Sequence, residues 1–306
     1  MVARAQRLTV LALLTLALLW LGVHWTSGRW LPGILGALLI INLQALILAV
    51  EFFVLLPIIN RGDTAAPPPG FAQVLRAWGR EVLTAHAVFG WQQPFRSQHH
   101  PDTIDAPDAP GRRAVVLVHG YLCNRGLWNR WVPKLLAARV PYIAITMEPP
   151  FASIDGYAAA IEAAIVRATA ATGVPPLLVG HSMGGVAIRA WWRSMGVLAD
   201  QRVHSAITIG SPHQGTFTAR LARGLNAHQM RLRGAWLGEL ARVEGESRNR
   251  RFTCFFSHCD NIVMPASAAM LPGADNRHVA GEPHVALAFA PEVIDEALRR
   301  LGPDSP

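Results

Sequence analysis

A serine flanked by glycines is the residue of this sequence best suited to chemistry. Ser182 lies in the run Gly180-His181-Ser182-Met183-Gly184, a Gly-x-Ser-x-Gly pattern between an apolar run and a helical stretch. A serine on a sharp strand-to-helix turn holds its hydroxyl above the sheet, and small neighbours at Gly180 and Gly184 relieve the crowding. The pattern therefore predicts a nucleophilic serine, with an ordinary glycine-rich turn as the alternative.

A serine hydroxyl becomes a nucleophile when a base takes its proton and a carboxylate orients that base. On a strand–turn–helix scaffold of this kind, the chain order is serine, acid, histidine. We predict His284 as the base and Asp260 as the acid, with Asp275 as the main rival of Asp260. Weaker candidates follow the serine as well: His213, His258, His278 and Glu282.

Acyl transfer also needs two N–H donors for the oxyanion that forms on the carbonyl oxygen. One predicted donor is the backbone N–H of Met183, which follows the nucleophile. The other is the backbone N–H of Tyr121, in the run His119-Gly120-Tyr121 after an apolar strand-like segment. His119 is not assigned a role in proton transfer.

The elements that must position these residues alternate between two periodicities. Short apolar runs predict buried strands, and longer stretches with helical spacing predict helices between them. The predicted strands are residues 114–118, 142–146, 177–180, 205–210, 252–256 and 277–280, and the predicted helices are residues 127–138, 157–171, 183–195 and 292–301. This alternation predicts an α/β fold with a mostly parallel sheet and helices on both faces.

Together these residues resemble the α/β-hydrolase family, and within it the bacterial triacylglycerol lipases and carboxylesterases. The resemblance covers about residues 113–300, and its carriers are VLVHGY at 116–121, GHSMGG at 180–185, GSPHQGT at 210–216 and the loops that hold Asp260 and His284. It implies the α/β-hydrolase fold, with Ser182 as nucleophile, His284 as base, Asp260 as orienting acid, and Tyr121 and Met183 as oxyanion donors.

Secreted lipases of this group often carry a calcium site near the histidine loop. Asp275 is similar in position to a calcium ligand, but no paired carboxylate accompanies it in the sequence. We therefore predict no metal and no cofactor.

The composition places an apolar excess at the N-terminus. The chain has 306 residues, of which 51% are apolar and 16% charged, and its three cysteines exclude a disulfide scaffold. Mean hydropathy is +0.26, which also excludes a disordered chain. Two apolar runs, at residues 8–25 and 31–59, account for most of the apolar excess. They predict a hairpin of two transmembrane helices, although the first run alone would also fit a signal peptide.

Glu51 interrupts the second apolar run. A carboxylate at membrane depth costs about 2.5–3.5 kcal/mol on insertion scales, so Glu51 should lie near an interface or be protonated. We expect an interfacial or helix-paired glutamate. Arginines flank both ends of the hairpin, and by the positive-inside rule they favour a cytoplasmic catalytic domain on the bacterial inner membrane.

The predicted organisation has three parts. Residues 1–60 form the membrane anchor, residues 61–112 a proline-rich linker and an amphipathic helix, and residues 113–306 the catalytic domain. Within that domain, residues 216–251 carry apolar residues and arginines at rough helical spacing. This segment is either a lid beside the pocket or an amphipathic helix packed on the sheet.

These features predict a membrane-anchored serine hydrolase, a lipase or esterase that cleaves carboxylic esters of lipids through an acyl-enzyme. The partners expected are a lipid or other ester substrate and the bilayer, because the sequence carries no nucleic-acid motif; the oligomeric state is left open. The alternatives are another acyl hydrolase or acyltransferase on the same triad, such as a thioesterase, phospholipase or polyester depolymerase, or a non-catalytic interaction protein on a hydrolase scaffold.

Overall fold

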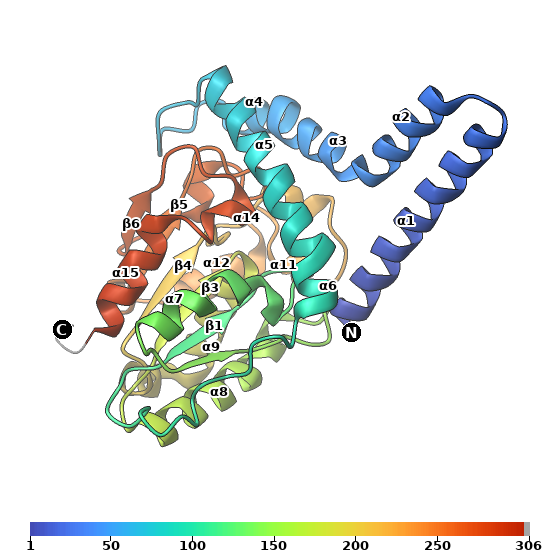
Figure 1. Ribbon diagram of the computed structural model, residues 1–306. Helices are drawn as coiled ribbons and strands as arrows, with labels where there is room; N and C mark the ends of the chain where they lie inside the picture. Colours follow the sequence, from blue (N-terminus) through green and yellow to red (C-terminus); the bar gives the residue numbers. More distant parts are fainter. Residues whose placement is uncertain (303–306) are drawn as a thin grey trace.

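A parallel sheet forms the centre of the computed structural model, which describes residues 1–302 (Figure 1). Within these residues the sheet has six strands in the order β2-β1-β3-β4-β5-β6. The strands are β1 (Val115–Val118), β2 (Tyr142–Ala144), β3 (Leu177–His181), β4 (Ser205–Ile209), β5 (Phe252–Phe256) and β6 (Asp275–His278). Each neighbouring pair is parallel, so the predicted α/β class with a parallel sheet is confirmed.

Both faces of the sheet are covered by helices. The connecting helices are α7 (Val132–Ala137), α8 (Ala158–Thr172), α9 (Met183–Met195), α14 (His284–Leu287) and α15 (Pro291–Leu301), with shorter turns η3 (Arg125–Arg130), η4 (Ile154–Tyr157), η5 (Gly196–Leu198), α10 (Ala199–Arg202) and η7 (Ala266–Ala269). Alternate residues of a strand point to opposite faces. In β1, Val116 packs with α8 and α9 on one face, while Val115 packs with α7 and α15 on the other.

The second strand was expected at residues 142–146 but ends at Ala144, and two other elements also need correction. The sixth strand was expected at residues 277–280 but is Asp275–His278, because its partner β5 fixes the register and the strand itself is polar and only partly buried. The helix expected at 127–138 is split into the 3₁₀ turn η3 and the short helix α7. Helix α9 and strand β5 have the bounds expected from the sequence.

The N-terminal hairpin projects away from the part of the chain that holds the sheet (Figure 1). Helix α1 (Val2–Thr26) pairs with α2 (Trp30–Ile41) across a short turn. The helices approach closely, because a Cβ on Gly36 of α2 would lie 2.0 Å from Nε1 of Trp20. Within residues 1–302, α1 is the one unbroken helix long and apolar enough to cross a membrane by length and composition.

The second predicted span is not one straight helix. It breaks at Asn42, where the chain bends by 58° before α3 (Leu43–Val50), the π-helical turn η1 (Glu51–Leu55) and α4 (Leu56–Ile59). The side-chain amide of Asn42 donates to the carbonyl of Leu38 at 2.8 Å, an alternative to regular helical bonding. The segments before and after the bend meet the criteria for a membrane span only when they are taken together.

The segment after the bend packs on the protein. Leu48, Phe52 and Leu56 are buried against α5 (Phe71–Ala87) and the loop after β5. Helix α5 continues into the π-helical turn η2 (Val88–Gln92) and α6 (Gln93–Arg96). The start of α1 is fixed to this region, since Nε2 of Gln6 donates to Oε1 of Gln93 at 2.9 Å.

Residues 216–251 form a run of short helices between β4 and β5. They are η6 (Phe217–Arg220), α11 (Leu225–Gln229), α12 (Ala235–Arg242) and α13 (Glu246–Asn249). Leu237 and Leu240 are buried in the core on the α9 face. A buried ion pair at 2.6 Å between Arg189 of α9 and Glu244 fixes the segment there.

Candidate active site

Ser182 occupies the sharp turn between β3 and α9. Its backbone has φ 55° and ψ −126°, a strained conformation for a residue with a side chain, and its N–H donates to the carbonyl of Ile209 at 2.8 Å. A Cβ on Gly184 would lie 2.3 Å from the carbonyl oxygen of Val118, and a Cβ on Gly180 would lie 2.6 Å from the backbone nitrogen of Gly185. Only glycine fits at both positions, which explains the spacing of the motif.

His284 and Asp260 form a buried pair. Nδ1 of His284 lies 2.9 Å from Oδ2 of Asp260, and the side chains are 6% and 2% exposed. The other carboxylate oxygen of Asp260 accepts the backbone N–H groups of Ile262 and Val263 at 2.9 and 2.8 Å. Burial lowers the pKa of His284, but the charge and hydrogen bond of Asp260 outweigh burial, so the pKa lies above its usual value. With the Nδ1 proton directed at the carboxylate, Nε2 is left to accept a proton.

Two further side chains fix the backbone of His284. Oδ1 of Asn261 accepts the backbone N–H of His284 at 3.3 Å, and Nε2 of His181 lies 3.0 Å from the His284 carbonyl, to which it donates. Burial lowers the pKa of His181 to about 3, so this imidazole is neutral at ordinary pH. Both residues were missed as functional candidates, because their partner is brought near only by the fold.

Glu81 of α5 is a buried carboxyl group behind His284. It is 1% exposed and accepts the backbone N–H groups of Val285 and Ala286 at 2.8 and 3.2 Å, at the start of α14. Burial raises the pKa of Glu81 to about 7, although the two backbone hydrogen bonds and His284 oppose the shift. The sequence carried a signal for it, since Glu81 shares the apolar face of α5 with Ala77 and Ala85.

Glu51 also reaches the site. Its Oε2 accepts a hydrogen bond of 2.6 Å from Nδ2 of Asn261, in the loop after β5. Of the two expectations for Glu51, the helix-paired one is wrong, because the partner is a loop residue next to Asp260.

The predicted oxyanion donors flank the serine. Met183 is the first residue of α9, where backbone N–H groups have no partner within the helix. Tyr121 lines the same cavity as Ser182. His119 lies in the loop before Tyr121: its Nδ1 is 2.8 Å from the carbonyl of Gly120, and its Nε2 accepts the N–H of Met147 at 2.9 Å. Burial lowers the pKa of His119 to about 4, so it is a neutral residue that holds the loop.

The rival candidates lie elsewhere. Asp275 accepts hydrogen bonds from Arg277 and Thr253, and Glu282 pairs with Arg80. His213 is buried beside Arg189, while the rings of His258 and His278 contact each other at an interplanar angle of 52°. In residues 1–302 no group of three or more His, Cys, Asp or Glu side chains is placed to hold a metal ion.

Ser182, His284 and Tyr121 line one cavity of about 280 Å³, here called the serine cavity. Ser182 and His284 line it from the sheet side, and Leu48, Glu51 and Glu81 line it from the N-terminal helices. Its lining includes no residue of 216–251, the segment considered as a lid. The N-terminal helices therefore cover the site.

Solved structures share this fold. Lipase BlEst2 of Bacillus licheniformis in its mature form superposes with a TM-score of 0.54 at 17% identity, over 65% of this chain and 94% of that one. Lipase B of Aspergillus fumigatus superposes with a TM-score of 0.53 at 18% identity. The match covers 62% of this chain and 52% of the lipase B chain. No match was found among curated protein sequences. The sequence profile of the alpha/beta hydrolase family matches residues 115–302, more than half of the chain, and the protein therefore belongs to the α/β hydrolase family.

Proposed function

We propose that this protein is a membrane-anchored serine hydrolase that cleaves carboxylic esters of lipids through an acyl-enzyme. The observation that carries the proposal is the hydrogen bond between His284 and Asp260, because His284 lines the same cavity as Ser182 on its strained turn. Nucleophile, base and orienting acid are the groups that ester hydrolysis needs.

In the proposed reaction, Nε2 of His284 takes the hydroxyl proton of Ser182 as Oγ attacks the ester carbonyl. The N–H groups of Met183 and Tyr121 stabilise the oxyanion. When the intermediate collapses, the C–O bond to the alcohol breaks and His284 returns its proton to the leaving alcohol. Water then attacks the acyl-enzyme by the same path in reverse and releases the acid.

Exposed side chains on the N-terminal helices support the proposal of a membrane anchor. Leu8, Leu18 and Val23 on α1 and Leu35 and Leu38 on α2 are exposed, so lipid is the environment that suits them. Trp25 and Trp30 lie exposed at the hairpin turn, on either side of Arg29, which suits a membrane interface. Arginines at the ends of the hairpin favour a catalytic domain on the cytoplasmic side.

A lipid substrate fits the walls of the serine cavity. Ile47, Leu48 and Phe89, from the N-terminal helices, line the cavity together with Ser182. Burial of an acyl chain against such residues stabilises the complex by about 0.8 kcal/mol for each CH₂ group.

The test is hydrolysis of p-nitrophenyl esters, a triacylglycerol and a phospholipid by the full chain in detergent. We expect ester turnover that Ser182→Ala abolishes and that Ser194→Ala, at the far end of α9, leaves unchanged. Turnover that survives Ser182→Ala, or a folded wild-type protein that cleaves none of these esters, contradicts the proposal. The preferred ester identifies the substrate class.

A further inference from the structure

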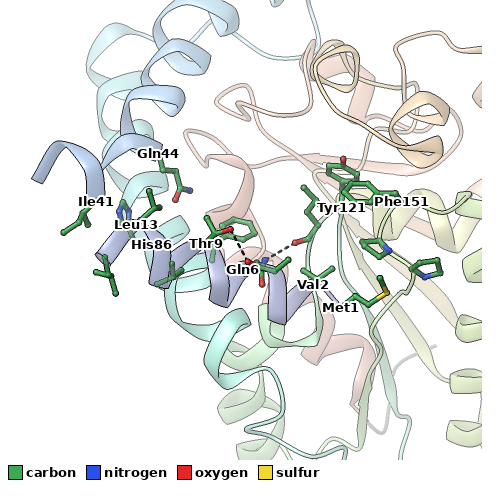
Figure 2. Close-up of a pocket in the computed structure, with 18 of the residues that line it drawn as sticks. Met1, Val2, Gln6, Thr9, Leu13, Ile41, Gln44, His86, Tyr121 and Phe151 are labelled. Carbon is green, nitrogen blue, oxygen red and sulfur yellow. Dashed lines mark hydrogen bonds between the residues drawn. The ribbon is translucent and has the colours of Figure 1, made fainter. Parts of the chain in front are cut away.

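A second and larger cavity lies between the membrane hairpin and the rest of the protein. It has a volume of about 1020 Å³ and is here called the hairpin cleft. One wall is a face of α1 that includes Gln6, Thr9 and Leu13, and the opposite wall is formed by the loops at 121–122 and 149–152 (Figure 2). Ile41 and Gln44, on either side of the bend at Asn42, close a third side.

The walls of the hairpin cleft are apolar and uncovered. Leu14, Leu122 and Phe151 line it and are 42%, 42% and 48% exposed. Large apolar side chains left in contact with water cost free energy in proportion to their exposed area. An apolar occupant would cover them, and the hairpin that forms one wall is the part of the chain whose surface suits a bilayer.

The hairpin cleft adjoins the serine cavity. Gln44, Phe89 and Tyr121 line both. The serine cavity alone, at about 280 Å³, is smaller than most ligand sites, which hold about 300–1,000 Å³. It has room for the ester group, and the space for a long chain lies next to it in the hairpin cleft.

We infer that the hairpin cleft binds the acyl chain of a long-chain lipid ester, so that helix α1 is a wall of the substrate site as well as an anchor. The inference rests on the proposed function and adds the place and class of the substrate. The acyl chain enters sideways from the bilayer between α1 and the bend at Asn42. It passes Phe89 and Tyr121, and its carbonyl reaches Ser182.

The matched variants Thr9→Trp and Thr15→Trp test this inference. Both threonines are exposed on α1, but Thr9 lines the hairpin cleft and Thr15 does not. Thr9→Trp fills the cleft, so we expect kcat/KM for p-nitrophenyl palmitate to fall about tenfold or more relative to p-nitrophenyl butyrate. Thr15→Trp is expected to leave this ratio within about twofold of the wild type. If Thr9→Trp cleaves both esters as the wild type does, the inference is wrong.

A second measurement needs no turnover. Palmitic acid with a diazirine at its methyl end is crosslinked to the full chain in lipid nanodiscs, and the labelled peptides are sequenced. Labels within residues 1–14 or 149–152 that Thr9→Trp removes and Thr15→Trp retains support the inference. Labels confined to other segments, or labels at these segments that Thr9→Trp does not reduce, contradict it. If the wild-type protein cleaves no ester, the proposed function is refuted. The crosslinking result still shows whether the hairpin cleft binds an acyl chain.

Discussion

Glu51, within the apolar N-terminal region, accepts a hydrogen bond of 2.6 Å from the side chain of Asn261, the residue that follows Asp260. Asn261 in turn accepts the backbone N–H of His284. A chain of contacts therefore runs from the proposed membrane anchor to the proposed base. The N-terminal helices and the hydrolase domain therefore line one candidate site together.

Replacing Asn261 by alanine removes both of these hydrogen bonds. A buried polar group left without a partner costs about 1–3 kcal/mol, so we expect the free energy of unfolding to fall by that amount. We also expect kcat to fall, because the backbone of His284 loses a support. Denaturant titration and ester turnover measure the two effects. Asn129→Ala, which removes one hydrogen bond to Arg96 outside the site, is the control; equal losses of kcat in both variants would refute this role.

A pair of isosteric variants tests whether Asp260 or Asp275 is the acid that orients His284. Asp260→Asn is expected to lower kcat about ten-thousand-fold, as when a triad aspartate elsewhere becomes asparagine and the histidine takes the wrong tautomer. Asp275→Asn should keep kcat within about twofold, because Asp275 contacts Arg277 and Thr253. Circular dichroism checks that both variants are folded. A large loss confined to Asp275→Asn would overturn the assignment of the acid.

Glu81 should make stability depend on pH. The folded protein holds a proton on Glu81 up to a pKa of about 7, whereas the unfolded chain releases it near 4.5. Because the folded state binds more protons in this window, stability falls as pH rises from about 4.5 to about 7, by roughly 3 kcal/mol at most. Glu81→Gln cannot titrate and should lose this part of the dependence.

The measurement for Glu81 is the urea midpoint of the wild type and of Glu81→Gln at several pH values. The charges of His284 and Asp260 act on Glu81, and both residues are present in both proteins, so the difference between the two curves isolates Glu81. The advantage of Glu81→Gln over the wild type should grow with pH through the window. Parallel curves would show that Glu81 does not carry a raised pKa.

The hairpin should remain on the mature protein. We expect the membrane fraction to hold a chain that includes residues 2–26 and resists alkaline carbonate extraction. Leu18→Arg places a charge on the exposed face of α1 and should weaken insertion by about 2.5–3.5 kcal/mol. Leu225→Arg, at an exposed leucine outside the hairpin, should not change extraction. A soluble chain that begins after α1 would show that the first helix is a cleaved signal.

Local patterns explain what could be predicted from the sequence. The turn at Ser182 depends on five consecutive residues, and α9 has the bounds that helical spacing implied. The order of strand-end residues ranks Asp260 above Asp275 as the predicted acid. Their places relative to His284 depend on the register of β5 and β6, which only the structure shows.

The parts that could not be predicted depend on packing between distant segments. Hydropathy treats residues 31–59 as one span, but the buried contacts of Phe52 and Leu56 hold its second half on α5. Glu81 was visible as a charged residue on an apolar helix face, yet its partners lie about two hundred residues further along the chain. A single sequence carries no information about such a pairing.

The most direct test of the central claim is covalent labelling of the full chain with a fluorophosphonate, followed by mass spectrometry of the labelled peptide. The expected result is one adduct on Ser182, absent from Ser182→Ala, retained in Ser194→Ala, and slowed by Asp260→Asn. A folded wild-type protein that takes no label, or an adduct on a residue other than Ser182, would contradict the proposal that Ser182, His284 and Asp260 form a hydrolytic triad.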